Sequence, residues 1–213
     1  RLSHEMKTPI GVIRAYAEGI QDETDEKKRQ RYSEIIISET ERMGMLIETL
    51  LDLSALENGA VSLAPERFDF IEFVETIAGR LLIDMPETDF ELQYELPEHK
   101  VFVYTDKQRM EQVIDNLIIN AKKNVSPKGI LRLSLIEQDN MLHFSIYNQG
   151  ASIPAEKLPK IWDKFYRDKN AKYNGSGLGL AIVAQILSMQ DLEYGAENLT
   201  DGIRFFFSIP IIK

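Results

Sequence analysis

Apolar residues in the first quarter of the chain follow a seven-residue repeat. The repeating positions are Ile36, Met43 and Leu50, and Leu46 and Leu53 each follow one of them by three residues. This spacing predicts a long helix with a coiled-coil seam, which Glu39 interrupts with one polar side chain. The helix should stop near Asn58-Gly59, a pair typical of a helix end. A shorter helix is predicted over residues 1–20, before the polar stretch 21–31.

These two helices form a predicted helical hairpin over residues 1–58. Two helices of this size cannot bury their apolar stripes against each other alone, which favours a four-helix bundle built from two chains. The alternative is a hairpin docked on the second domain of its own chain. Residues 59–65 are predicted to be a linker, and residues 66–213 the second domain.

From residue 66 onward the pattern changes to a mixture of short strands and helices. Strands are predicted over 90–96, 101–104, 131–135, 142–146 and 203–209. Helices are predicted to begin at Asp69 and Asp106, which are good capping residues, and after Leu178. Asp139-Asn140 suits a turn between two of the strands. The mixture favours an α+β fold, with helices layered on one face of a mixed sheet.

Composition excludes several classes of function. The formal net charge is −9 and no basic patch dominates, so we expect no nucleic-acid partner. There is no cysteine, which excludes disulfides, thiolate catalysis and thiolate metal sites. No apolar run approaches the roughly 18 residues of a membrane helix. The chain opens at Arg1, almost directly on a histidine motif, so we expect a piece of a longer protein.

That motif is Ser3-His4-Glu5-Met6-Lys7-Thr8-Pro9. On a helix, His4 and Thr8 lie one turn apart on the same face. A carboxylate beside an imidazole can take the proton from one ring nitrogen and leave the other as a nucleophile. The zinc-protease motif is excluded because it needs a second histidine where Thr8 stands. From these seven residues alone, an ordinary surface histidine remains an alternative.

Asn116 and Asn120 lie four residues apart on a predicted helix. Two amides one turn apart present oxygen ligands from a rigid wall, which suits a hard cation that keeps its waters and binds phosphate, such as Mg²⁺. The alternative is a pair of solvated asparagines.

Gly175-Ser176-Gly177-Leu178-Gly179 runs into an apolar helix. Glycines let backbone N–H groups approach phosphates, and a helix N-terminus adds partial positive charge. No lysine follows, which excludes a Walker A loop, and the polar stretch 167–174 stands where a dinucleotide fold needs a strand. That stretch resembles a lid, with Arg167 among its cations; a plain flexible loop is the alternative.

Two further segments precede this lid in the sequence. Asn148 ends a predicted strand, and its amide could meet a base edge in the turn 148–154. Residues 161–166 form an aromatic cluster that contains Trp162, which we interpret as core that anchors the lid rather than as a base-stacking platform.

In this order the motifs resemble the cytoplasmic kinase core of bacterial sensor histidine kinases. The similar segments are His4 to Pro9 (H box), Asn116 to Asn120 (N box), Asn148 to Pro154 (G1 box), Trp162 to Phe165 (F box) and Gly175 to Leu180 (G2 box). The resemblance covers essentially the whole chain. It implies a dimerisation and phosphoacceptor hairpin, half of a dimeric four-helix bundle, followed by a gyrase-type (GHKL) ATP-binding α/β sandwich.

The resemblance also implies roles for single residues. His4 would attack the γ-phosphate of Mg-ATP with Glu5 as general base, and Thr8 would position water for dephosphorylation of a response regulator. Asn120 would hold Mg²⁺. The implied nucleotide-binding residues are Asn116, Asn120, Lys123, Asn148, Gly150, Ile153, Arg167, Gly175, Gly177, Leu178 and Gly179. The implied partners are a second copy of the chain and a response regulator receiver domain. The full-length protein would be anchored by preceding segments on the cytoplasmic side of the bacterial plasma membrane.

Three positions depart from the family pattern. Asn148 replaces the aspartate that accepts a hydrogen bond from the adenine amino group. Exchanging a charge-assisted bond for a neutral one costs about 1 kcal/mol, or about five- to tenfold in affinity. Ser152 replaces a glycine, and Asn124 stands where an aromatic residue usually lies against adenine. We therefore expect weaker ATP binding than is typical.

Two other functions compete with the kinase. A nucleotide-sensing pseudokinase scaffold would bind a response regulator without efficient autophosphorylation. A gyrase-type ATPase would couple lid closure to dimer rearrangement, but Asn116 stands where those enzymes carry a glutamate that activates water.

Overall fold

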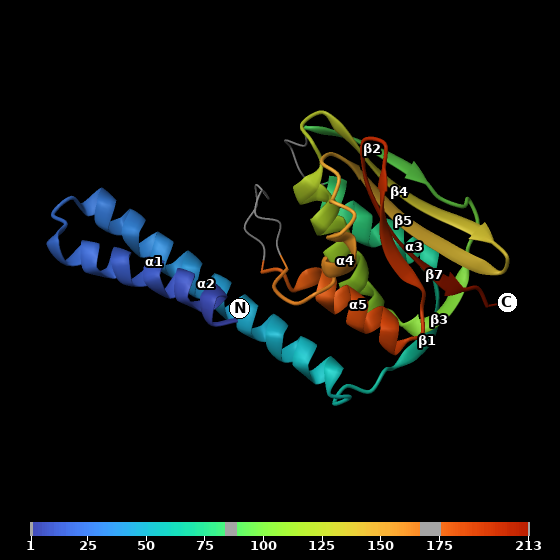
Figure 1. Cartoon of the computed structure of the whole chain (residues 1–213), viewed down its shortest axis with the longest axis horizontal. Coiled ribbons are helices and arrows are strands. Elements are labelled where there is room, and N and C mark those ends of the chain that lie inside the picture. The colour runs from blue at the N-terminus through green and yellow to red at the C-terminus, as the bar shows by residue number, and fades with distance from the viewer. Residues whose placement is uncertain (1, 84–88, 167–175, 213) are drawn as a thin grey trace.

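The computed structural model describes residues 2–83, 89–166 and 176–212. Its N-terminal part is a hairpin of two helices, α1 (Leu2–Asp22) and α2 (Glu26–Glu57) (Figure 1). Asp25 caps α2 by accepting a hydrogen bond from the Lys27 backbone N–H at 2.9 Å. The helix ends at Glu57, and Gly59 follows with φ +66°, a left-handed conformation that glycine adopts without strain. The predicted hairpin and its stop are confirmed.

A five-stranded mixed sheet forms the second part of the structure. Its strand order is β2-β4-β5-β7-β6, and only the β2–β4 pair is parallel. The strands are β2 (Phe90–Glu95), β4 (Gly129–Gln138), β5 (Met141–Gln149), β6 (Tyr194–Leu199) and β7 (Gly202–Pro210). A separate two-stranded sheet pairs β1 (Pro65–Asp69) with β3 (Phe102–Asp106).

Helices cover one face of the large sheet. They are α3 (Phe70–Ala78), which continues into a π-helical turn (Gly79–Ile83), α4 (Lys107–Asn124) and α5 (Gly179–Met189), with a 3₁₀ turn at Leu158–Lys160. Figure 1 shows α4 and α5 lying between this sheet and the helical hairpin. The predicted α+β fold with helices on one face is confirmed. Among the described helices, none is both long and apolar enough to cross a membrane.

The core lies between these helices and the sheet. The inward face of α4 is at most 1% exposed and consists of Met110, Val113, Ile114, Leu117, Ile118 and Ala121. Alternate residues of β4, β5 and β7 meet it, and the rings of Phe144 and Phe207 stack with centroids 4.7 Å apart. Apolar side chains at the helical period on α4 and at every second residue of the strands are therefore enough to define the layers.

Two strands were not predicted. β1 begins at Pro65, at the end of the segment expected to be a linker, and β6 was not recognised. β1 is mostly exposed, and the residues of β6 are nearly all half-buried, because both strands lie at sheet edges. Neither therefore shows the apolar alternation that marks a strand with one buried face.

The C-terminal turns of α2 dock on the α/β part. Leu53 and Leu56 are 1% exposed and belong to the same buried cluster as the core. Beside them, the Arg109 guanidinium donates to both carboxylate oxygens of Asp52 at 3.0 and 3.1 Å, and Gln112 donates to the same carboxylate at 2.7 Å. Docking on the same chain therefore uses only one end of the hairpin, and it leaves other apolar residues of α2 exposed.

A double-mutant cycle at Asp52 and Arg109 tests this contact. We expect Asp52→Asn and Arg109→Gln to show a coupling free energy of about 1 kcal/mol in urea unfolding, because both side chains are partly shielded from water. The exposed pair Arg14–Glu18, with a 2.7 Å contact, is the control and should couple by no more than about 0.5 kcal/mol. Equal coupling in the two cycles would contradict the proposed docking role.

Candidate functional site

Helix α4 forms one wall of the candidate site. Its inward face is buried, and Asn116 and Asn120 lie on the flank of that face, both half-buried. Asp106 is the N-cap of this helix, and its side chain accepts a hydrogen bond from the Arg109 backbone N–H at 2.9 Å. The predicted register of α4 is confirmed, and it places the two amides one helical turn apart.

The N-terminus of α5 lies directly against this wall. A Cβ atom added at Gly179, the first residue of α5, would lie 2.6 Å from the side-chain amide oxygen (Oδ1) of Asn116. Gly177 precedes it with φ +69°, and a Cβ there would meet the backbone of Phe165 and Tyr166 at 2.8–2.9 Å. Two glycines are therefore required here for close backbone approach. The structure brings the predicted glycine-rich segment and the predicted amide together.

The two asparagines of α4 differ in how they are held. The Asn116 amide nitrogen donates to the Gln112 carbonyl at 2.8 Å, so its oxygen faces Gly179. The Asn120 side-chain oxygen accepts from Asn124 at 3.3 Å and keeps a second lone pair. Neutral amide oxygens fit a cation that takes most of its ligands from water and phosphate, as Mg²⁺ does. The described residues contain no cluster of three or more His, Asp or Glu side chains placed to hold a metal ion.

Asn148 lies at the end of β5, on the sheet face that the helices cover. It is 1% exposed, and neither its amide nitrogen nor its amide oxygen has a hydrogen-bond partner among the described residues. An unsatisfied buried polar group costs about 1–3 kcal/mol. Such a group is a strong pointer to a ligand, because a bound partner would remove that cost.

The turn after β5 packs against the C-terminal end of α4. A Cβ at Gly150 would lie 2.6 Å from the Asn124 carbonyl oxygen and 3.6 Å from the Asn148 amide nitrogen. Farther along the turn, Asn198 of β6 clamps Ile153: its amide donates to the Ile153 carbonyl at 2.6 Å and accepts from the Ile153 N–H at 3.0 Å. The turn is thus fixed on both sides of the site.

Asp201 is the second anchor of this turn. Its carboxylate accepts from the Tyr147 hydroxyl at 2.6 Å and from Gln149 at 2.9 Å, and its backbone carbonyl accepts from the Gly150 N–H at 2.9 Å. Burial, together with the Asp201 carboxylate, raises the pKa of Tyr147 to about 12. Sequence analysis missed Asn198 and Asp201, since both come from the unrecognised β6 and the turn after it. No motif marks them.

The remaining predicted residues are distributed as follows. Leu178 is buried, Lys123 is exposed in the last turn of α4, and Arg167 and Gly175 lie outside the described residues. His4 belongs to the first turn of α1, where Glu5 is half-buried and Thr8 is exposed. The extensive contacts of α1 are with α2. The histidine motif and the glycine-rich segment therefore belong to different parts of the structure.

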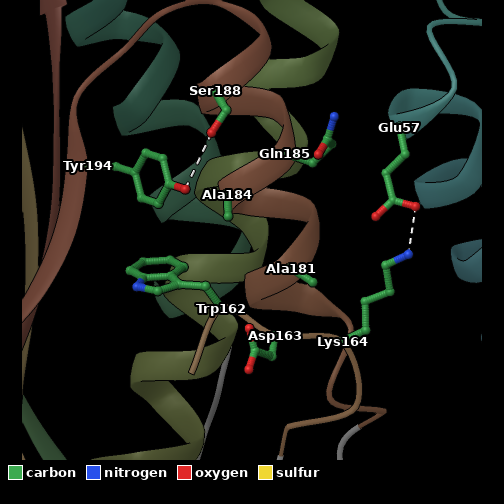
Figure 2. Close-up of a pocket in the computed structure, with 9 residues that line it drawn as sticks. All are labelled: Glu57, Trp162, Asp163, Lys164, Ala181, Ala184, Gln185, Ser188 and Tyr194. Atoms are coloured by element: carbon green, nitrogen blue, oxygen red, sulfur yellow. Dashed lines mark hydrogen bonds and ion pairs between the residues drawn. The ribbon is translucent and has the colours of Figure 1, made fainter. Parts of the chain in front are cut away.

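A groove runs between α5 and the end of α2, and Figure 2 shows the side chains that line it. The Lys164–Glu57 ion pair, at 2.6 Å, closes one side. On the other side Trp162 packs edge-on against Tyr194 and Phe205, with ring centroids 5.1 and 5.9 Å apart. These contacts agree with the interpretation of the aromatic cluster as core.

A second groove follows the outer flank of α4. It runs from Asp52 and Arg109 at the hairpin contact to Asn116 at the candidate site. Asp115 lies along it, paired with Arg80 at 2.7 Å. Burial raises the pKa of this carboxyl, although the Arg80 charge opposes the shift. The hairpin contact and the amide wall are therefore on one continuous surface.

Comparisons with known proteins identify both parts of the chain. Residues 1–59 match the family model described as His Kinase A (phospho-acceptor) domain. Residues 105–213 match the model described as Histidine kinase-, DNA gyrase B-, and HSP90-like ATPase.

Similar whole proteins include the sensor histidine kinase WalK of Bacillus subtilis, 30% identical over 98% of this chain. The sensor protein kinase WalK of Staphylococcus aureus is 32% identical over 98% of this chain and is covered to 52% of its own length. The chain spans 35% of the Bacillus protein.

Among solved structures, the histidine kinase AdeS of Acinetobacter baumannii is 26% identical, with a TM-score of 0.77 over 99% of this chain and 98% of that chain. The histidine kinase ThkA, solved in complex with the response regulator protein TrrA, shares the fold with a TM-score of 0.82 at 23% identity, over 100% of this chain and 60% of that chain.

The contact between Gly179 and Asn116 can be tested by adding a single methyl group. We expect Gly179→Ala to weaken ATP binding about tenfold, because the new Cβ displaces the Asn116 amide and at least one hydrogen bond is lost. Titration calorimetry measures the effect. Gly79→Ala is the matched control, since a Cβ there meets nothing within 4 Å. Unchanged affinity in the Gly179 variant would mean that this close approach does not shape the site.

Proposed function

The chain belongs to the family of bacterial sensor histidine kinases, and from this premise we propose that it is the ATP-dependent catalytic core of such a kinase, which phosphorylates its own His4. The observation that carries the proposal is the close packing of the α5 N-terminus against Asn116. A helix N-terminus beside an amide oxygen favours a phosphate chain with its cation. Asn148 supplies the polar group for the base at the other end of the same wall.

In this proposal each part of the site has its own task. The backbone around Gly177, Leu178 and Gly179 binds the phosphates, and Asn116 and Lys123 lie beside them. Asn120 holds Mg²⁺, whose charge offsets the negative charge that spreads over the transferred phosphoryl oxygens. Gly150 and Ile153 shape the turn around the base. Arg167 and Gly175, outside the described residues, are assigned to the lid on the resemblance alone.

The transfer step needs a nucleophilic imidazole. We propose that Glu5 accepts the proton from one ring nitrogen of His4, which leaves the other ring nitrogen free to attack the γ-phosphorus. An N–P bond forms, the bond between the γ-phosphorus and the bridging oxygen breaks, and ADP leaves with that oxygen. Positioning and charge neutralisation supply the catalysis in this class of reaction. Because the histidine motif lies on the hairpin and the nucleotide wall on the α/β part, transfer requires the two parts to bring His4 and the γ-phosphate together.

We further propose the division of labour implied by the family. Residues 1–58 serve dimerisation and phosphotransfer, 59–65 link the parts, and 66–213 bind ATP. His4 passes its phosphoryl group to an aspartate of a response regulator, and Thr8 orients water for the reverse dephosphorylation. The complete protein is placed at the cytoplasmic side of the plasma membrane, held there by segments that precede this chain.

The labelling test uses ATP carrying a labelled γ-phosphate. We expect acid-labile, base-stable label on the unmodified protein and none on His4→Gln. His99→Gln is the matched control and should keep the label, because His99 is an exposed loop residue paired with Glu137 at 2.6 Å. Label that survives His4→Gln would refute the assignment. Absence of label in the unmodified protein would favour the pseudokinase scaffold.

The same preparation tests Thr8. Thr8→Ala should retain autophosphorylation while dephosphorylation of a phosphorylated response regulator falls at least tenfold, since the water loses the hydroxyl that orients it. Equal loss of both activities would instead point to a damaged helix.

The exposed apolar face of α2 is assigned to the homodimer. Ile37, Met45 and Leu51 are 57%, 62% and 64% exposed, which is unusual for large apolar side chains on one helix. A second copy of the hairpin would cover them in a four-helix bundle.

Leu51→Lys tests this face by sedimentation. We expect dimer dissociation to become about a hundredfold more favourable, because a buried leucine contributes about 1.5–3 kcal/mol and a buried unpaired charge costs more. Ile136→Lys, at a 46% exposed residue of β4, is the control and should leave dimerisation unchanged. If Leu51→Lys dimerises normally, the hairpins associate through another face.

A further inference from the structure

No hydrogen bond among the described residues fixes the orientation of the Asn148 side-chain amide. Its cross-strand neighbours are Leu131 on β4 and Ile203 on β7, which are 0% and 3% exposed. Both are aliphatic and offer neither a donor nor an acceptor. Since neither amide atom has a hydrogen-bond partner among the described residues, exchanging the two atoms by a half-turn about the last side-chain bond loses no hydrogen bond that the structure records.

Hydrogen bonds fix the orientation of three other side-chain amides around the site. Asn198 both donates to and accepts from the Ile153 backbone. Gln149 donates to Asp201 and accepts from the Ile130 N–H at 3.1 Å. Asn116 donates to the Gln112 carbonyl. The freedom of Asn148 is therefore a property of that position and not of the surrounding turn.

This freedom decides which base the site can accept. Adenine carries an amino group at position 6, which donates, whereas hypoxanthine and guanine carry an oxygen there, which accepts. A carboxylate accepts only, so it pairs with the amino group and repels the oxygen. An amide can accept from the 6-amino group through its oxygen. After a half-turn about the last side-chain bond, it can donate to the 6-oxygen through its nitrogen.

We propose that Asn148 makes this nucleotide site tolerant of both 6-amino and 6-oxo purine triphosphates, so that GTP and ITP bind with affinities comparable to that of ATP. The inference rests on the proposed function, because it takes the base end of the ATP site to be at Asn148. It extends that function by changing the substrate class from adenine nucleotides to purine nucleotides.

The hydrogen bonds available at Asn148 determine how far the affinities for ATP and ITP should differ. Both purine classes make one neutral hydrogen bond to the same amide, so ATP and ITP should bind within about threefold of each other. A buried acceptor facing another acceptor leaves both unsatisfied, which lowers affinity about tenfold or more. In Asn148→Asp, ITP should therefore bind at least about tenfold more weakly than ATP. ITP is the sharper probe than GTP, because it changes position 6, and with it N1 from an acceptor to an N–H donor, without adding the 2-amino group of guanine.

The experiment measures dissociation constants of ATP, ITP and GTP by calorimetry for the unmodified protein, Asn148→Asp and Asn140→Asp. The last variant adds the same charge in the β4–β5 turn, where Asn140 has φ +62°, and should keep the tolerance of the unmodified protein. Purine riboside triphosphate, which has no group at position 6, is expected to bind the unmodified protein about five- to tenfold more weakly than either ATP or ITP.

The outcomes separate the two proposals. ATP and ITP of similar affinity, with selectivity for ATP appearing only in Asn148→Asp, supports the inference. ATP that binds at least tenfold more tightly than ITP to the unmodified protein overturns it and leaves the kinase function standing. Failure of all nucleotides to bind overturns the proposed function, and the inference with it. The ligand series on the unmodified protein decides the matter even if Asn148→Asp does not fold.

Discussion

The packing of α4 against the sheet is the constraint on which the rest of the structure depends. One face of this helix is fully buried, from Met110 to Ala121, so its rotation about its own axis cannot change without exposing the core. The flanks of the same helix then have fixed directions. One flank presents Asn116 to the α5 N-terminus, and Arg109 reaches Asp52 on the hairpin. The packing of this one helix face therefore fixes the positions of both the nucleotide wall and the contact with α2.

The polar groups around the site differ in whether they have hydrogen-bond partners within the described residues. Tyr147, Gln149 and the Gly150 backbone all bind Asp201, so the turn that borders the site is held by internal bonds. Asn148 lies beside them and is buried, but its side-chain amide makes no hydrogen bond with the described residues. A rigid frame around one unsatisfied amide keeps that group in place for a ligand, at a cost in stability that binding removes.

The contact between the two parts of the chain combines buried apolar side chains with ion pairs. The leucines at the end of α2 share the core cluster of the α/β part, and two ion pairs flank them, Asp52–Arg109 and Glu57–Lys164. Partly exposed ion pairs contribute little each, so burial of the two leucines accounts for most of the free energy that holds the docked arrangement.

Periodicity alone determined the layers of this protein. The heptad leucines, the buried face of α4 and the alternating residues of β4, β5 and β7 all have one side in the core, and burial of one side is what produces a readable repeat. The same repeats located the asparagines of α4, whereas the glycine-rich segment indicated the start of α5 after Leu178. Edge strands β1 and β6 carry no such repeat, so the sequence did not reveal them. Only the tertiary structure brought Asn198 and Asp201 to the turn after β5, and only it buried Asn148 with no hydrogen-bond partner in the part of the chain that is described. These are contacts between residues about 45 to 54 positions apart, set by strand order and not by any local pattern.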